Sequence, residues 1–124
     1  MSESPDSERI LIVEDNAATR KLAARMLSSL GYRVDVAKDA EEAIDLLRTE
    51  QFDILFTDIV MPGERDGIAL AREVRHNHPD IHIIFTSGFS EMNPQDIEEL
   101  RATYVTKPYR KAEIAKILRD VIGQ

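Results

Sequence analysis

The 124-residue sequence contains no cysteine, no long apolar run and no excess of basic side chains. The lack of cysteine excludes disulfides, thiolate chemistry and cysteine metal sites, and it agrees with a reducing compartment. No apolar run approaches the roughly 20 residues that a membrane helix needs, and residues 1–8 lack the basic and apolar regions of a signal peptide. We therefore expect a cytoplasmic protein that does not interact with membranes.

The charge balance is acidic, with 23 Asp and Glu against 16 Lys and Arg and a formal net charge of -7. Six acidic residues in two places account for most of this excess: Glu3, Asp6, Glu8, Glu14, Asp15 and Asp58. The rest of the chain is close to neutral and shows no basic stripe. Binding to the phosphate backbone of a nucleic acid is therefore not expected.

The length and a hydrophobic content of 43% suit one compact domain with its own core. Residues 1–8 are polar and include a proline, which predicts a flexible leader ahead of a single folded domain at residues 9–124. There is no internal repeat and no low-complexity segment.

Apolar segments and helical patterns alternate along residues 9–124. Short apolar or alternating segments predict strands at residues 9–13, 32–36, 52–57, 81–85 and 104–106. Apolar residues at helical spacing, with Asn16 and Asn93 as N-caps, predict helices at residues 16–30, 40–47, 70–76, 93–100 and 114–121. This alternation predicts an α/β fold, a parallel sheet covered on both faces. The first, third and fourth strands are continuously apolar and fit central positions, whereas the second fits an edge.

Polar residues follow four of the five predicted strands. They are Glu14 and Asp15 after the first, Asp58 after the third, Thr86 and Ser87 after the fourth, and Lys107 after the fifth. Ligands of open parallel sheets bind at the carboxyl ends of the strands, and all of these residues lie there. An acidic pair alone could simply favour a helix N-terminus, but four strand ends with complementary chemistry indicate a site.

Three carboxylates at one rim repel one another unless a cation neutralises them. Oxygen ligands alone suit a hard ion such as magnesium, which leaves one carboxylate free to react. A carboxylate can attack phosphorus and form an aspartyl phosphate, while a metal, an ammonium group and a hydroxyl neutralise the phosphoryl oxygens. Asp58, Lys107 and Thr86 are the candidates for nucleophile, ammonium group and hydroxyl.

Five short motifs contain these residues. They are Ile12-Val13-Glu14-Asp15-Asn16, Thr57-Asp58-Ile59-Val60-Met61-Pro62-Gly63, Asp66-Gly67, Phe85-Thr86-Ser87-Gly88 and Lys107-Pro108. Their order and spacing resemble the receiver domain of bacterial two-component response regulators, from about residue 8 to the end of the chain. The fourth motif is most similar to the form found in hybrid sensor kinases and single-domain regulators. The resemblance implies a flavodoxin-like (βα)5 fold, a doubly wound five-stranded parallel sheet with strand order 2-1-3-4-5.

The resemblance implies a phosphorylation site and a metal site at the rim. Asp58 would accept the phosphoryl group. Glu14, Asp15 and the backbone carbonyl of Val60 would join Asp58 around Mg2+, for which Mn2+ could substitute.

The resemblance also implies a conformational switch. Thr86 would move to hydrogen-bond the phosphoryl group, Lys107 would pair with a phosphoryl oxygen, and the Lys107–Pro108 peptide would be cis. Tyr104 would turn inward as Thr86 moves, although an aromatic residue on a short strand can also serve packing alone. The signalling face would comprise the predicted elements at residues 93–100, 104–106 and 114–121.

A receiver of this kind implies protein partners. The phosphoryl donor would be a sensor histidine kinase or a histidine phosphotransfer protein, and a downstream protein would bind the signalling face. The receiver would be a monomer or a weak homodimer, and it would catalyse only its own phosphorylation and slow dephosphorylation. The chain would be either a single-domain regulator or a receiver excised from a longer protein.

Two other functions share parts of this pattern. Aspartyl-nucleophile phosphohydrolases commonly place a second aspartate two residues after the nucleophile, where this sequence has Val60. A receiver that only binds proteins, without phosphorylation, is expected to lack an acidic, threonine or lysine position, and none is missing. Three histidines surround a turn remote from the acidic rim and are expected to be solvated: His76, His78 and His82.

Three departures from the family pattern concern the readout. The loop at residues 63–65 is about one residue longer than usual, Ser87 replaces a common alanine, and the segment Arg101-Ala102-Thr103 lacks the glycine usual before the aromatic residue. We therefore expect the chemistry to follow the family more closely than the switch.

Overall fold

The computed structural model describes residues 8–61, 66–88 and 93–123. The strands are β1 (Arg9–Val13), β2 (Arg33–Ala37), β3 (Ile54–Asp58), β4 (His82–Ser87) and β5 (Thr103–Thr106). The helices are α1 (Ala17–Ser29), α2 (Ala40–Thr49), α3 (Gly67–Asn77), α4 (Pro94–Leu100) and α5 (Lys111–Ile122). None of the helices in these ranges is long and apolar enough to span a bilayer. The predicted leader, apart from its last residue, and the lengthened loop at residues 63–65 lie outside the described residues.

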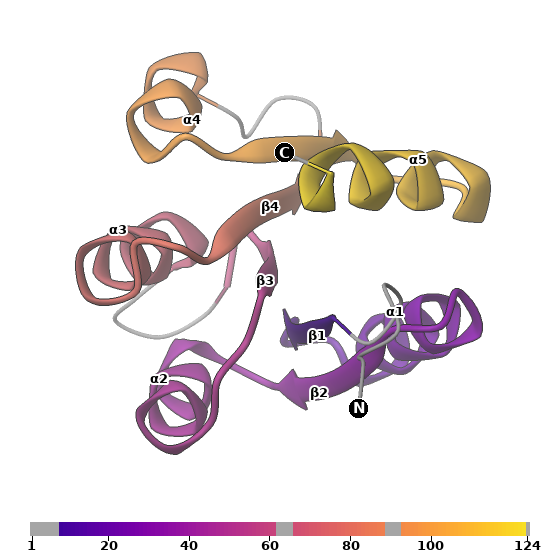
Figure 1. Cartoon of the computed structure of the whole chain (residues 1–124), viewed down its shortest axis with the longest axis horizontal. Helices are drawn as coiled ribbons and strands as arrows, with labels where there is room; N and C mark the ends of the chain where they lie inside the picture. Colours follow the sequence, from indigo (N-terminus) through magenta and orange to yellow (C-terminus); the bar gives the residue numbers. More distant parts are fainter. Residues whose placement is uncertain (1–7, 62–65, 89–92, 124) are drawn as a thin grey trace.

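All five strands belong to one parallel sheet in the order β2-β1-β3-β4-β5. In Figure 1, α1 and α5 cover one face of the sheet, and α2, α3 and α4 cover the other. This arrangement confirms the predicted flavodoxin-like fold and its strand order. β2 forms an edge and is partly exposed, whereas β1, β3 and β4 are buried almost throughout, as their apolar runs predicted.

β3 and β4 continue beyond the end of their apolar patterns. Asp58 is the last residue of β3, and β4 runs through Thr86 to Ser87. Asp58 and Thr86 are partners in the parallel register. Pairing between strands therefore extends into the polar residues, so that the sheet ladder, rather than a free loop, positions them.

Side-chain caps mark where four of the helices begin. Asn16, Asp39, Asp66 and Asn93 each accept a hydrogen bond from a backbone N–H in the first turn of the helix that follows. Pro94 follows its cap as the first residue of α4, where the missing N–H is tolerated. The start of the weakly patterned α4 was thus predictable from local chemistry.

Strand residues alternate between two hydrophobic clusters, one on each face of the sheet. Beneath α1 and α5, the strands contribute Ile10, Ile12, Ile54, Phe56, Ile84 and Val105. Beneath α2, α3 and α4, they contribute Leu11, Val13, Ala37, Leu55, Ile83 and Phe85. The alternation follows from the two-residue period of strand side chains. Each buried strand residue therefore predicts the face of the residue two positions later.

Candidate functional site

Four candidate side chains continue the face of the sheet that α1 and α5 cover. Each comes two positions after a core residue of that face: Glu14 after Ile12, Asp58 after Phe56, Thr86 after Ile84 and Lys107 after Val105. Because strand side chains repeat every two residues, the register of the core carries over to the polar residues. Asp15 has the opposite phase and is exposed.

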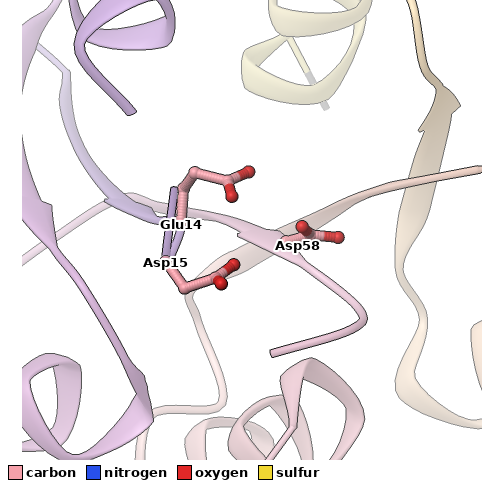
Figure 2. Close-up of side chains that lie close together, drawn as sticks. All are labelled: Glu14, Asp15 and Asp58. Carbon is pink, nitrogen blue, oxygen red and sulfur yellow. The ribbon is translucent and has the colours of Figure 1, made fainter. Parts of the chain in front are cut away.

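The three predicted carboxylates come together at the ends of β1 and β3 (Figure 2). Glu14, Asp15 and Asp58 each offer a carboxylate oxygen, and these oxygens lie within 4.8 Å of one another. Glu14 is 6% exposed and Asp58 is 8% exposed, so water screens the repulsion between them weakly. An all-oxygen set of two buried carboxylates and one exposed carboxylate suits a hard divalent cation such as Mg2+.

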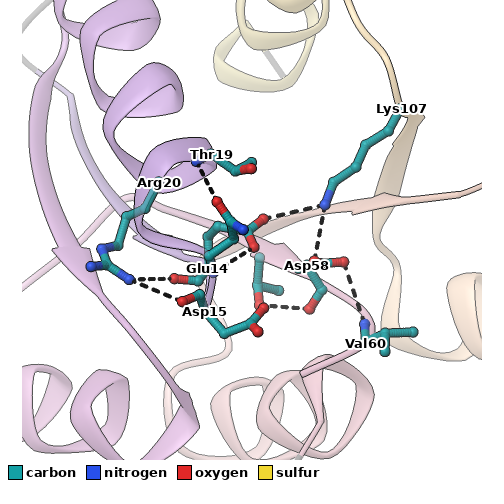
Figure 3. Close-up of polar contacts among 9 residues, drawn as sticks. Glu14, Asp15, Thr19, Arg20, Asp58, Val60 and Lys107 are labelled. Atoms are coloured by element: carbon teal, nitrogen blue, oxygen red, sulfur yellow. Dashed lines mark hydrogen bonds and ion pairs between the residues drawn. The ribbon is translucent and has the colours of Figure 1, made fainter. Parts of the chain in front are cut away.

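Lys107 connects the two buried carboxylates (Figure 3). Its Nζ donates a hydrogen bond to Asp58 Oδ2 at 2.9 Å and another to Glu14 Oε1 at 3.2 Å. Glu14 Oε2 also accepts a hydrogen bond from the backbone N–H of Asn16, at 3.1 Å. One ammonium group therefore pairs with two of the three carboxylates, which leaves the cluster suited to a further cation.

The surroundings of the site change the pKa of both Glu14 and Lys107. Burial is the main cause that raises the pKa of Glu14, and the charge of Asp58 adds to it, whereas the Asn16 N–H and Lys107 act in the opposite sense. Burial also opposes the charge of Lys107, but hydrogen bonds and charge from Asp58 and Glu14 together outweigh it and raise the pKa of Lys107. Lys107 is therefore held as an ammonium donor.

Thr86 and the Val60 backbone lie next to Asp58. Thr86 is 3% exposed and pairs with Asp58 in the β3–β4 ladder. The Val60 N–H points at Asp58 Oδ1 over 3.4 Å, while the Val60 side chain is largely exposed. The Ile59 N–H donates to the Thr86 carbonyl at 3.1 Å, which keeps the segment after Asp58 attached to β4.

β5 and the residue after it place Tyr104 and Lys107 on opposite faces of the sheet. The backbone N–H of Lys107 donates to the Ser87 carbonyl at 2.7 Å, and the Lys107–Pro108 peptide bond is cis. Tyr104 pairs with Phe85 and has the opposite phase to Val105, so it lies on the other face of the sheet from Glu14 and Asp58. Its side chain is half exposed.

Two residues near the site were missed by the sequence analysis. The guanidinium of Arg20, in the first turn of α1, donates from one nitrogen to the Glu14 carbonyl at 2.9 Å and to the Asp15 carbonyl at 3.5 Å (Figure 3). The Tyr109 ring packs edge-on against Phe56 with 6.0 Å between centroids, and burial, followed by the charges of the site, raises the pKa of Tyr109. Tyr109 could have been found from its phase, because it follows Lys107 by two residues. No sequence pattern indicates the role of Arg20, because a polar residue in the first turn of a helix is expected to be solvent-exposed.

The histidines lie away from the carboxylates. His76 is in the last turn of α3, His78 is the C-cap of α3, and His82 opens β4 at the amino end of the sheet. In the described ranges, the one cluster suited to a metal consists of the three carboxylates at the opposite end.

The comparison with protein families identifies the class of protein. Residues 10–119 match the family model described as the response regulator receiver domain. The chain belongs to this family, as the five motifs predicted. It is 35% identical over 119 residues to the response regulator receiver protein CpdR of Brucella abortus, covering 94% of this chain and 92% of that protein.

Two similar solved structures carry ligands at their own sites. The receiver domain of a sensor histidine kinase from Pseudomonas aeruginosa, with magnesium coordinated in its active-site cleft, is 32% identical with a TM-score of 0.81, covering 95% of this chain and 99% of that one. The response regulator TrrA of Thermotoga maritima, in complex with Mg2+ and BeF, is 29% identical with a TM-score of 0.83, covering 92% and 98%. Longer relatives match over one part only: the chain spans 13% of the sensor kinase CckA of Brucella abortus.

Proposed function

We propose that this receiver is a phosphoacceptor, in which Asp58 takes a phosphoryl group from a sensor histidine kinase or a histidine phosphotransfer protein in a Mg2+-dependent reaction. The observation that carries the proposal is the contact of Lys107 Nζ with both Asp58 and Glu14 beside the exposed carboxylate of Asp15. A nucleophile, a fixed ammonium group and a cation site are thus assembled around one carboxylate.

The residues of the rim fit the metal that this chemistry needs. Glu14, Asp15 and Asp58, together with the backbone carbonyl of Val60, would hold Mg2+, or Mn2+ in its place. When bound, the ion neutralises the negative charge of the carboxylates and of the phosphoryl oxygens. The Mg2+ in the Pseudomonas aeruginosa receiver and the Mg2+ and BeF in TrrA support this assignment.

The transfer exchanges one bond for another. A carboxylate oxygen of Asp58 attacks the phosphorus of a phosphohistidine, the P–O bond forms as the P–N bond breaks, and the histidine leaves with the electron pair of that bond. Lys107 stabilises the charge on a phosphoryl oxygen, and the Thr86 hydroxyl donates a hydrogen bond to another. Water later hydrolyses the aspartyl phosphate and returns Asp58 to its free carboxylate.

The phosphoryl group would be read at the face formed by α4, β5 and α5. A movement of Thr86 toward the phosphoryl group displaces β4 beside Tyr104, whose register partner Phe85 is the chain neighbour of Thr86. Inward rotation of the half-exposed Tyr104 would then change the surface that a downstream protein binds. We expect no turnover of other phosphate esters, because Val60 stands where an aspartyl phosphohydrolase commonly has its acid or base.

The proposal is tested by incubating the chain with acetyl phosphate and Mg2+ and measuring its intact mass. We expect the wild type to gain one phosphoryl group, and Asp58→Asn and a sample with EDTA to gain none. Asp45→Asn, which removes an exposed aspartate on α2, should be labelled like the wild type. No added mass on the wild type, or equal labelling of Asp58→Asn, contradicts the proposal.

A further inference from the structure

Arg20 contacts the backbone of the two residues that bring carboxylates from β1. Its guanidinium nitrogen donates to the carbonyl of Glu14 at 2.9 Å and, over a longer 3.5 Å, to the carbonyl of Asp15. The backbone N–H of Arg20 donates to the carbonyl of Asn16 at 2.8 Å, in the first turn of α1. One residue of α1 therefore binds three successive carbonyls of the segment between β1 and the helix.

Among the described residues, the backbone of this segment has few other hydrogen bonds. Glu14 and Asp15 follow the last residue of β1, and the sheet reaches them through one backbone hydrogen bond, from the Glu14 N–H to the Ala37 carbonyl at 3.1 Å. The Asp15 side chain is exposed, so packing does not determine its direction. The buried Glu14 carboxylate is also held by Lys107 and the Asn16 N–H, whereas the direction of the Asp15 carboxylate depends on the backbone that Arg20 binds.

The charge of Arg20 is directed at carbonyl oxygens and not at the carboxylates. Among the described contacts, it is Lys107 that pairs with the carboxylates of Glu14 and Asp58. A guanidinium is permanently protonated, and several N–H groups lie in its plane, so it can bind two carbonyls in a fixed geometry. Arg20 thus leaves the carboxylate oxygens available to a cation.

We propose that Arg20 is a positioning residue for the divalent cation: it holds the Glu14–Asp15 backbone so that both carboxylates stay within reach of Asp58. The inference rests on the proposed function, because it concerns the cation of the same site. Arg20 contacts neither the cation nor the phosphoryl group, so its loss lowers the affinity for Mg2+ and leaves the transfer at saturating Mg2+ largely intact.

The direction of the change in Mg2+ affinity distinguishes a positioning role of Arg20 from an effect of its positive charge alone. Removing a positive charge near a cation site should strengthen Mg2+ binding, because the repulsion between the two cations disappears. Removing a positioning contact should weaken it, and losses of this kind typically reach 10–100-fold, or about tenfold at the lower end. Arg20→Gln removes both at once, so weaker binding shows that positioning dominates.

The experiment measures Mg2+ binding to the full chain by isothermal titration calorimetry, with Mg2+ alone as the ligand. We expect Arg20→Gln to raise the Kd about tenfold and Arg20→Lys to fall between it and the wild type, since lysine keeps the charge and loses the paired geometry. Lys21→Gln, an exposed charge loss one residue further along α1, should leave the Kd unchanged or lower it. Circular dichroism and the Tm without Mg2+ establish that each variant is folded, and if Arg20→Gln does not fold, the comparison is made with Arg20→Lys.

A second readout separates binding from chemistry. At saturating Mg2+, the rate of labelling of Arg20→Gln by acetyl phosphate should return to within about threefold of the wild type, since the lost contact acts on the cation site alone. An Arg20→Gln Kd equal to or below that of Lys21→Gln overturns the inference while the proposed function stands. Mg2+ binding by a wild type that gains no phosphoryl mass sinks the proposed function alone.

Discussion

Gly67 lies directly against the backbone of Asp58. A Cβ atom at Gly67 would lie 2.0 Å from the Asp58 carbonyl oxygen and 2.8 Å from the Ile59 Cα, far inside van der Waals contact. The Gly67 N–H donates to the Ile59 carbonyl at 2.8 Å, so that the first residue of α3 and the end of β3 are joined. A glycine is needed at this position because two backbone segments approach each other closely. This close approach accounts for the glycine of the Asp66-Gly67 motif.

Gly67→Ala should therefore destabilise the protein and displace Asp58. Overpacking of this kind typically lowers the free energy of unfolding by about 1–3 kcal/mol, and the close contacts are with rigid backbone, so we expect the upper part of that range. Urea unfolding measures the change. Gly123→Ala at the end of α5 is the matched control, with a closest contact of 3.1 Å, and should change stability little. Equal effects of the two substitutions would show that the approach to Asp58 is not as close as described.

Lys107→Met should have opposite effects on stability and on Mg2+ binding. Without the ammonium group, the buried carboxylates of Glu14 and Asp58 face each other unpaired, and we expect the metal-free protein to lose about 1–2 kcal/mol of unfolding free energy. Mg2+ should bind several-fold more tightly, because Lys107 no longer competes for the same oxygens. Thermal unfolding with and without Mg2+ measures both changes.

The control for Lys107 is Lys116→Met on α5. Lys116 forms an exposed ion pair with Asp120 at 3.0 Å, and its loss should change stability by no more than about 0.5 kcal/mol, with Mg2+ affinity unaltered. Weaker Mg2+ binding by Lys107→Met would contradict the competition between the ammonium group and the cation.

Glu14→Gln should stabilise the metal-free protein at neutral pH and weaken Mg2+ binding. Because burial raises the pKa of Glu14 above its ordinary value of 4.5, the folded state holds this proton more tightly than the unfolded state. The stability that Glu14 contributes is thus present below the unfolded pKa and is lost as pH rises through the folded pKa. Replacing Glu14 with a neutral amide removes that loss.

The pH dependence of urea unfolding tests this prediction. The difference between Glu14→Gln and the wild type, both without Mg2+, should grow in favour of the variant as pH rises from 4.5 toward neutrality. Glu98→Gln, which changes an exposed glutamate of α4, should show no such growth. If instead the wild type became more stable than Glu14→Gln as pH rises, the stabilising effect of Lys107 on the Glu14 carboxylate would have to exceed the cost of burying its charge.

Arg75 should be the main support of α4. Its Nε donates to the Leu100 carbonyl at 3.0 Å, and one terminal nitrogen donates to the carbonyls of Pro79 and Ile81 at 2.8 and 2.9 Å. Burial, and after it the charge of Arg101, lowers the pKa of Arg75. Arg75→Met leaves these carbonyls unpaired and should lower the unfolding free energy by about 1–3 kcal/mol.

Hydrogen exchange across residues 94–100 should accelerate in Arg75→Met as α4 loses its attachment. Arg72→Met is the control, because Arg72 also reaches α4 from α3, through ion pairs with Asp96 at 2.7 Å and Glu99 at 3.6 Å in which the Arg72 side chain is half exposed. Its loss should change stability by about 1 kcal/mol or less. A larger effect from Arg72 would assign the attachment of α4 to the surface charges instead.

The fold was predictable because its local patterns agree with its long-range order. Continuous apolar runs distinguished the central strands from the edge strand β2, and Asn16 and Asn93 marked two helix starts. The predicted strands ended before β3 and β4 do in the structure. The pairing of Asp58 with Thr86 extends these strands, and no local sequence pattern indicates a contact between strands. Long-range contacts also help to explain why α4 forms despite its weak pattern, since Arg72 and Arg75 of α3 contact it.

The candidate site was predictable in its residue types and less so in its contacts. The rule that polar residues at the carboxyl ends of parallel strands share one site selected Glu14, Asp15, Asp58 and Lys107, which the structure brings together. The sequence does not show that Lys107 contacts two carboxylates at once. Nor does it show that Arg20 binds carbonyls, because this contact depends on how α1 packs against the end of β1.

The continuation of the sheet register into the polar residues has a consequence for selectivity between ions. Asp58 ends β3, and Glu14 directly follows Val13, the last residue of β1 that pairs with β3, so we expect the gap between their backbones to stay close to the strand spacing of about 4.8 Å. Substitutions that repack the hydrophobic clusters can change stability without changing this width. We therefore expect core variants to select between small and large divalent ions as the wild type does.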